Sequence, residues 1–124
     1  MIIIDSCGWL EFYTDGPLVN KYAPYLNDLQ AIVTPDIIIY EVYKKIKRER
    51  SEADALLAIG PLHKTNVVPL DTQLVLLAAD LSLEFGLPMA DAFVYATSRL
   101  YKCKVITSDK HFKDLEDVIY FPKT

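Results

Sequence analysis

The sequence of 124 residues is poor in several features, and each shortage excludes a class of protein. Its two cysteines, Cys7 and Cys103, form no CxxC pair, so we expect two reduced, partly buried thiols. With only two histidines, no His/Cys cluster is available to bind a soft metal. No apolar run approaches the ~20 residues that a membrane-spanning helix requires.

The amino-terminal residues also lack the features of a targeting segment. They read MIIIDSCGWLEF, without a basic stretch and with Asp5 almost at the start, which predicts no signal peptide. Apolar residues make up 52% of the chain and charged residues 24%, as in an ordinary globular protein. We therefore expect a single domain over residues 1–124, located in the cytoplasm and not associated with a membrane.

Charge is unevenly distributed along the chain. The formal net charge of -4 argues weakly against unaided binding to nucleic acid. Residues 44–50, however, read KKIKRER and carry five of the 13 basic side chains. This run is either a solvated helix face or a surface that contacts RNA phosphates, and the candidates for contact are Lys44, Lys45, Lys47 and Arg48.

Short β-branched runs alternate with longer helical patterns. Strands are expected at residues 2–5, 31–34, 66–70, 104–107 and 118–121, and helices at 7–14, 18–29, 35–50, 51–60, 71–85 and 89–101. The first four strands are almost unbroken apolar runs, which suits strands covered on both faces, whereas the fifth ends at Pro122 like an edge strand. The alternation predicts an α/β fold with three layers (α/β/α) and a parallel sheet of about five strands.

Two acidic residues follow strands that could be neighbours in this sheet. Asp5 ends the first strand, and Asp109 comes two residues after the strand at 104–107. Ligands of such sheets bind outside the carboxyl ends of the strands, at the point where the strand order reverses. If the two strands are adjacent, both carboxylates lie in one crevice.

Two further acids occur in unusually apolar surroundings. Glu41 lies within IIIYEVYKKI and Asp91 within GLPMADAFVYA. Taken singly, each of the four acids has a simpler explanation, because acids cap helices, favour first helical turns and occupy solvated surfaces. Together they would repel one another and raise some of their pKa values unless a cation bound between them. Carboxylate oxygens suit Mg²⁺ or Mn²⁺, which would activate water and hydrolyse a phosphodiester.

The motifs around these acids resemble those of PIN-domain ribonucleases, in particular the VapC-type toxins of toxin–antitoxin pairs. The resemblance runs in order over nearly the whole chain, through IIIDSCGWLEF, PDIIIYEVYKKI and GLPMADAFVYATSRLYKCKVITSDKHF. Members of the family have an Asp followed by Ser or Thr after the first strand, a Glu on a helix, an Asp before Ala, and a T-x-D after the fourth strand. The matching residues are Asp5-Ser6, Glu41, Asp91, and Thr107 with Asp109.

This resemblance carries specific expectations about activity and partners. It implies a Mg²⁺- or Mn²⁺-dependent endoribonuclease, a toxin that forms a homodimer and is inhibited by a cognate antitoxin filling the active groove. Asp5, Glu41, Asp91 and Asp109 would be the catalytic acids that bind one or two metal ions. Ser6 and Thr107 would orient those carboxylates by hydrogen bonding.

Three other functions compete with this interpretation. A phospho-acceptor receiver domain is also a small α/β fold, and Asp71 could be its phosphorylated residue. That fold expects two adjacent acids after its first strand, where this chain has Ser6 and Cys7. A haloacid-dehalogenase-like phosphatase would need D-x-D there. A PIN-like module that only binds partners would be expected to have lost some of the four acids.

The aromatic residues and histidines also admit two interpretations. Tyr40, Tyr43 and Tyr95 lie near the acids and could stack on bases, although core packing or a protein interface is the favoured role. His111 lies two residues after Asp109, where a surface role is favoured over contact with the acids or with substrate.

Overall fold

The computed structural model describes residues 1–123 and contains five short strands, all paired in parallel. Strands β1, β4 and β5 form one sheet in the order β1-β4-β5, and β2 pairs with β3. A bridge between Ile2 and Ile32 joins the two groups, which gives the spatial order β3-β2-β1-β4-β5. The strands are β1 (Ile2–Ile4), β2 (Val33–Pro35), β3 (Asn66–Val68), β4 (Lys104–Thr107) and β5 (Val118–Tyr120). The predicted α/β fold is therefore confirmed.

Six α-helices and four short 3₁₀ helices connect the strands within residues 1–123. The α-helices are α1 (Ser6–Thr14), α2 (Val19–Tyr22), α3 (Asp36–Glu49), α4 (Glu52–Ile59), α5 (Thr72–Phe85) and α6 (Met89–Tyr101). The 3₁₀ helices are η1 (Ala23–Leu26), η2 (Leu29–Ala31), η3 (Pro61–Lys64) and η4 (Lys110–Phe112).

Side-chain caps define where several helices begin and end. Asp71 and Ser51 each accept a backbone N–H three residues ahead, at 2.9 and 3.0 Å, and so begin α5 and α4. Gly86 ends α5 in the left-handed conformation, with φ of 68°. The bounds of α4 and α5 therefore agree with the helices expected at residues 51–60 and 71–85.

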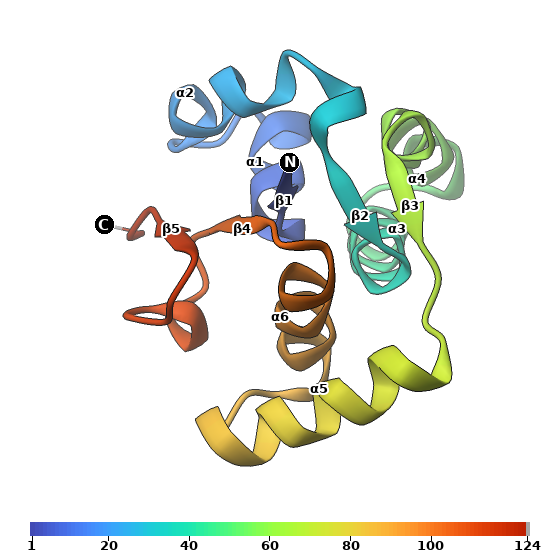
Figure 1. Ribbon diagram of the computed structural model, residues 1–124. Helices are drawn as coiled ribbons and strands as arrows, with labels where there is room; N and C mark the ends of the chain where they lie inside the picture. The colour runs from blue at the N-terminus through green and yellow to red at the C-terminus, as the bar shows by residue number, and fades with distance from the viewer. Residues whose placement is uncertain (124) are drawn as a thin grey trace.

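The helices lie on both sides of the strands (Figure 1). Helices α1 and α2 are above β4 in that view, and α5 and α6 are below β1 and β4. Helix α6 contacts β1, β2 and β4, so it is the principal cover of that face. The core between the layers is built from fully buried aliphatic and aromatic side chains, including Ile3, Ile4, Trp9, Ile38, Tyr95 and Phe112.

Three details of the expected structure were wrong. Strand β3 is not covered on both faces, because the side of β3 that bears Val67 leaves that side chain 37% exposed while Val68 is buried. Residues 18–29 do not form one helix, since Pro24 lacks a backbone N–H donor, and α2 gives way to η1 at Ala23 after only four residues. Strand β2 begins at Val33 because η2 extends to Ala31.

No single helix in residues 1–123 is long and apolar enough to cross a membrane. Helices α5 and α6 together have the length and apolar composition of a span, but they are bent by 112° at their junction.

Candidate metal centre

The strand order places the first and fourth strands side by side and opens the cleft at their carboxyl ends. Ile4 pairs with Ile106, and the backbone N–H of Asp5 donates to the carbonyl of Ile106 at 3.0 Å. The strand order reverses at this pair, since β1 continues toward β2 and β4 toward β5. Asp5 and the residues after Thr107 therefore emerge at one crevice, as expected for ligand sites in parallel sheets.

Asp5 is 3% exposed and is held by hydrogen bonds on both carboxylate oxygens. Oδ1 accepts the backbone N–H of Ser6 at 2.8 Å, which caps α1, and Oδ2 accepts the hydroxyl of Thr107 at 2.7 Å. Burial raises the pKa of Asp5 despite these two hydrogen bonds, and the nearby Asp109 carboxylate raises it further. Asp5 is thus a rigidly oriented carboxyl group in a site that disfavours its negative charge.

Thr107 connects Asp5 to the following turn. Its hydroxyl donates to Asp5 and accepts the backbone N–H of Asp109 at 3.0 Å. Asp109 in turn caps η4 by accepting the backbone N–H of His111 at 2.9 Å. One threonine hydroxyl therefore fixes the relative positions of two acidic residues that are more than 100 positions apart in sequence.

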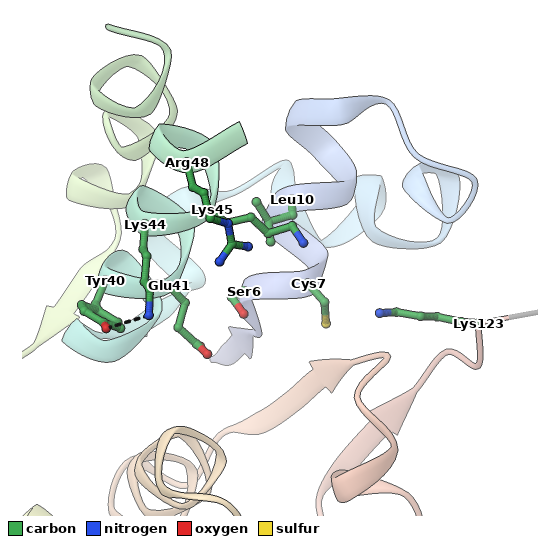
Figure 2. Close-up of a pocket in the computed structure, with 9 residues that line it drawn as sticks. All are labelled: Ser6, Cys7, Leu10, Tyr40, Glu41, Lys44, Lys45, Arg48 and Lys123. Atoms are coloured by element: carbon green, nitrogen blue, oxygen red, sulfur yellow. Dashed lines mark hydrogen bonds between the residues drawn. The ribbon is translucent and has the colours of Figure 1, made fainter. Parts of the chain in front are cut away.

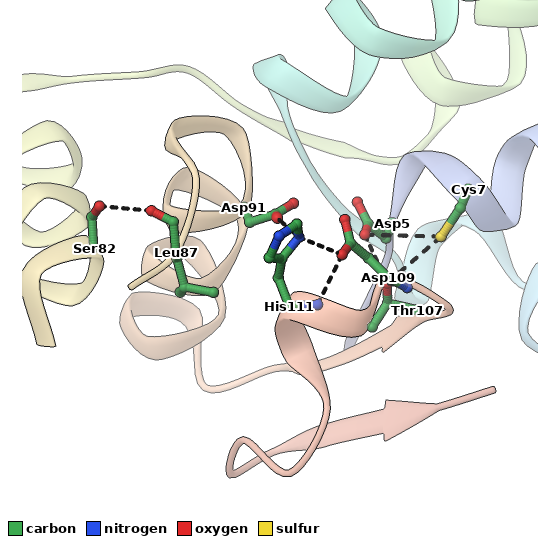
Figure 3. A network of polar contacts seen from close by, with 8 residues as sticks. All are labelled: Asp5, Cys7, Ser82, Leu87, Asp91, Thr107, Asp109 and His111. Atoms are coloured by element: carbon green, nitrogen blue, oxygen red, sulfur yellow. Dashed lines mark hydrogen bonds and ion pairs between the residues drawn. The ribbon is translucent and has the colours of Figure 1, made fainter. Parts of the chain in front are cut away.

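Asp91 approaches the same site from the first turn of α6. It is 8% exposed, and its Oδ2 lies 3.1 Å from Nδ1 of His111. The same ring nitrogen lies 2.7 Å from Oδ1 of Asp109, so the imidazole stands between the two carboxylates (Figure 3). Burial raises the pKa of Asp91 to about 7, and the charges of Asp109 and Asp5 add to the rise.

Glu41 completes the group from the second turn of α3. Burial raises its pKa to about 7, the charge of Asp5 adds to the rise, and the side chain of Ser6 opposes it. All four predicted acids line a single open cleft of about 490 Å³, together with Ser6, Cys7, Ser108, Lys110, His111 and Lys123. Four separate segments of the chain therefore deliver one carboxyl group each to one cleft.

A second cleft of about 340 Å³ adjoins the acidic one and is basic. Lys44, Lys45 and Arg48 extend from α3 on one side, and Lys123 approaches from the carboxyl-terminal segment on the other (Figure 2). The two clefts share Glu41 and Lys123, along with Ser6 and Cys7. A polyanion lying in the basic cleft would therefore reach the four acids without leaving the surface.

Lys47, the fourth predicted basic contact, does not line either of these clefts. Its ammonium group lies over the Tyr43 ring, 5.5 Å from the centroid, and 3.7 Å from a carboxylate oxygen of Glu52. Lys47 instead lines a neighbouring groove with Tyr40, Tyr43, Lys44 and Arg48, where its ion pair with Glu52 directs it toward α4.

Five residues that line the acidic cleft were not predicted as site residues: Cys7, Ser108, Lys110, His111 and Lys123. Lys123 follows β5, and its position could have been inferred, since the carboxyl ends of all five parallel strands meet at one edge. Cys7 packs against Asp5 and Thr107, with Sγ 3.6 Å from the Thr107 hydroxyl, and burial raises the pKa of its thiol to about 11. The inward orientation of the His111 ring depends on the η4 turn, which the residue pattern around Asp109 does not predict.

Tyr95 belongs to the core, as favoured from the sequence, because it is 1% exposed and its ring packs against Phe85 and Phe112. Tyr40 is 56% exposed beside the basic cleft, with the Lys44 ammonium 5.3 Å from its ring centroid. Both cysteines are free thiols, as expected.

Comparison with protein families identifies the fold that carries this site. Residues 2–118 match the profile of the PIN domain. The chain belongs to the PIN domain family. No curated protein sequence shows significant similarity to this PIN domain.

Solved structures with the same fold are distant in sequence. A toxin–antitoxin complex from Klebsiella pneumoniae is 22% identical, with a TM-score of 0.79 over 99% of this PIN domain and 100% of that chain. VapBC2 from Rickettsia felis, bound to a DNA fragment from its promoter, is 13% identical, with a TM-score of 0.76 over 98% of both chains. VapC20 from Mycobacterium tuberculosis, a sarcin-ricin loop cleaving toxin, is 14% identical, with a TM-score of 0.70 over 84% of this chain and 85% of that one.

Proposed function

We propose that this protein is a Mg²⁺- or Mn²⁺-dependent endoribonuclease and the toxin component of a type II toxin–antitoxin pair. The observation that carries the proposal is the cleft lined by Asp5, Glu41, Asp91 and Asp109. The PIN domain family and the toxin–antitoxin relatives support it from an independent direction. The substrate class is RNA, and the bond that is hydrolysed is a phosphodiester.

The donor set fits a hard divalent cation. All four acids offer carboxylate oxygens, which Mg²⁺ and Mn²⁺ prefer. The pKa values of Asp5, Glu41 and Asp91 are raised because burial and mutual repulsion disfavour their charged forms. A bound cation relieves that repulsion, so the cleft is better suited to hold a metal than to remain as free carboxylates.

Each protein group has a distinct part in the reaction. A divalent cation held by the four acids would supply a nucleophilic water at neutral pH and offset the charge that develops on the phosphate. Thr107 keeps Asp5 oriented through its hydroxyl, and Ser6 does so through its backbone N–H. Lys44, Lys45 and Arg48 in the basic cleft would bind RNA phosphates beside the acids and align the strand with them.

The rival functions have less support. The phospho-acceptor function assigned to Asp71 needs acids gathered around that residue, but Asp71 is an exposed cap of α5 and does not line the acidic cleft. A module that only binds partners would have no need to keep four acids at one cleft. We therefore favour catalysis over both alternatives.

Two protein partners accompany the proposed toxin function. The inhibitor would be an antitoxin whose chain fills the acidic and basic clefts, as the resemblance to toxin–antitoxin complexes suggests. The second partner would be another copy of this chain. An apolar cleft of about 220 Å³ between α5 and α6, with Val75 and Met89 exposed beside it, is a surface of the kind that proteins cover by self-association. The proposed site of action is the cytoplasm.

Incubation of the purified protein with total RNA tests the proposed activity. We expect cleavage in Mg²⁺ or Mn²⁺ and none in chelator, with new ends that map to defined positions. The control is Asp91→Asn prepared in the same way, which should reduce cleavage by at least about 100-fold because it removes one charged ligand. Equal cleavage by the parent and Asp91→Asn, or undiminished cleavage in chelator, would identify a contaminating nuclease and overturn the proposal.

A further inference from the structure

The imidazole of His111 lies where a side chain that binds the metal ion would lie, beside two of the four acids. Its Nδ1 lies 3.1 Å from Asp91 Oδ2 and 2.7 Å from Asp109 Oδ1 (Figure 3). One ligand atom from each of these three residues falls within 4.8 Å of the others. In an octahedral site with bonds of about 2.1 Å, adjacent ligand atoms are separated by about 3 Å. The spacing between the nitrogen and the two carboxylates is therefore close to that of neighbouring ligands around one ion.

The turn that carries the ring is fixed on both sides. Asp109 is held by the hydroxyl of Thr107, which accepts its backbone N–H, and it caps η4 through the N–H of His111. On the other side, Phe112 is fully buried and packs edge-to-face on Tyr95, with 6.2 Å between ring centroids. The side chain of His111 itself is 54% exposed, so an ion can reach it from solvent. The ring thus points into the cleft from a rigid support.

We propose that His111 is a metal ligand of this site through Nδ1, and that its nitrogen makes the site select Mn²⁺ over Mg²⁺. This inference rests on the proposed metal-dependent function and adds a fifth protein ligand to the four acids. Mg²⁺ is bound mainly by oxygen, whereas imidazole nitrogen favours later divalent metals along the series that begins with Mn²⁺. Neutral imidazole would bind the ion with the Nδ1 lone pair and keep its proton on Nε2.

A competing arrangement uses the same distances differently. The ring could serve only as a hydrogen-bond donor to Asp91 and Asp109, in which case a metal would displace it. The two arrangements differ in one observable property, which is whether nitrogen is bonded to the metal. A spectroscopic measurement on the Mn²⁺-loaded protein separates them without reference to activity.

The test is electron spin-echo envelope modulation of the tag-free full chain loaded with one equivalent of Mn²⁺. We expect ¹⁴N modulation from directly bonded imidazole in the parent and its loss in His111→Gln. The matched control is His63→Gln, which removes the other histidine, an exposed residue of η3, and should retain the signal. In competition titrations, His111→Gln should reduce the preference for Mn²⁺ over Mg²⁺ on the order of tenfold.

The outcomes separate this inference from the proposed function. Mn²⁺ bound without ¹⁴N modulation, or with modulation that persists in His111→Gln, would overturn the role of His111 and leave the four-acid site intact. An aqueous Mn²⁺ spectrum that is unchanged by the parent protein would overturn both, since no ion would then be bound.

Discussion

At the scale of single residues, Asp5 combines a helix-capping role with a position in the proposed metal site. Its Oδ1 caps α1 and its Oδ2 accepts the Thr107 hydroxyl, yet the carboxyl group still lines the acidic cleft. Capping had seemed the simpler alternative to a metal site when only the sequence was considered. The hydrogen bonds instead fix the orientation of a carboxylate that a cation could share.

The raised pKa values predict how the metal-free protein responds to pH. Glu41 and Asp91 shift from 4.5 and 3.8 to about 7 in the folded protein, so folding favours their protonated forms. Stability from this source is fully present below about pH 4 and is lost as the pH rises through 7. In chelator at pH 8, we expect the melting temperature of Asp91→Asn to exceed that of the parent by on the order of 5 °C. At pH 4 the two proteins should have the same melting temperature.

Thermal denaturation followed by circular dichroism in chelator measures this difference. Asp80→Asn, which neutralises an exposed carboxyl on α5, serves as the control and should melt like the parent at both pH values. A parent and Asp91→Asn that melt together at pH 8 would contradict the electrostatic conflict assigned to the cleft.

At the scale of elements, β1 and β4 could be foreseen as carriers of the site. Their apolar runs end at Asp5 and just before Asp109, and parallel pairing brings those ends to one edge. The helices that bear Glu41 and Asp91 could be predicted from their periodicity. The orientation of individual α3 side chains could not, because it depends on where α4 packs and draws Lys47 toward Glu52.

The basic residues of α3 that line the basic cleft are predicted to affect RNA binding more than Lys47, which does not line it. Lys45 and Arg48 line the basic cleft, so replacing both with Ala should weaken binding and reduce the slope of log K against log salt concentration by about 0.7 for each lost phosphate contact. Lys47→Ala should leave the slope unchanged. Binding is measured by fluorescence anisotropy with single-stranded RNA, all in an Asp91→Asn background that prevents cleavage. If Lys47→Ala reduced the slope as much as the double replacement, residues 44–50 would attract RNA only through their general positive charge.

At the scale of the whole molecule, the α/β class could be predicted from the sequence, but the burial of every strand could not. Alternating strand and helix patterns predicted a parallel sheet, and the PIN domain match agrees with it. The exposure of Val67 in β3 was not predicted, because a valine reads as apolar whether or not another element packs over it. Tertiary packing decides such cases, and a single strand contains no information about its neighbours.

The central claim is that four carboxylates from distant segments act as one metal site. Isothermal titration of the metal-free protein with Mn²⁺ at neutral pH tests it most directly. We predict saturable binding by the parent and by Asp80→Asn, with affinity reduced at least about tenfold in each of Asp5→Asn, Glu41→Gln, Asp91→Asn and Asp109→Asn. Unchanged Mn²⁺ affinity in these four variants, all folded by circular dichroism, would contradict the account.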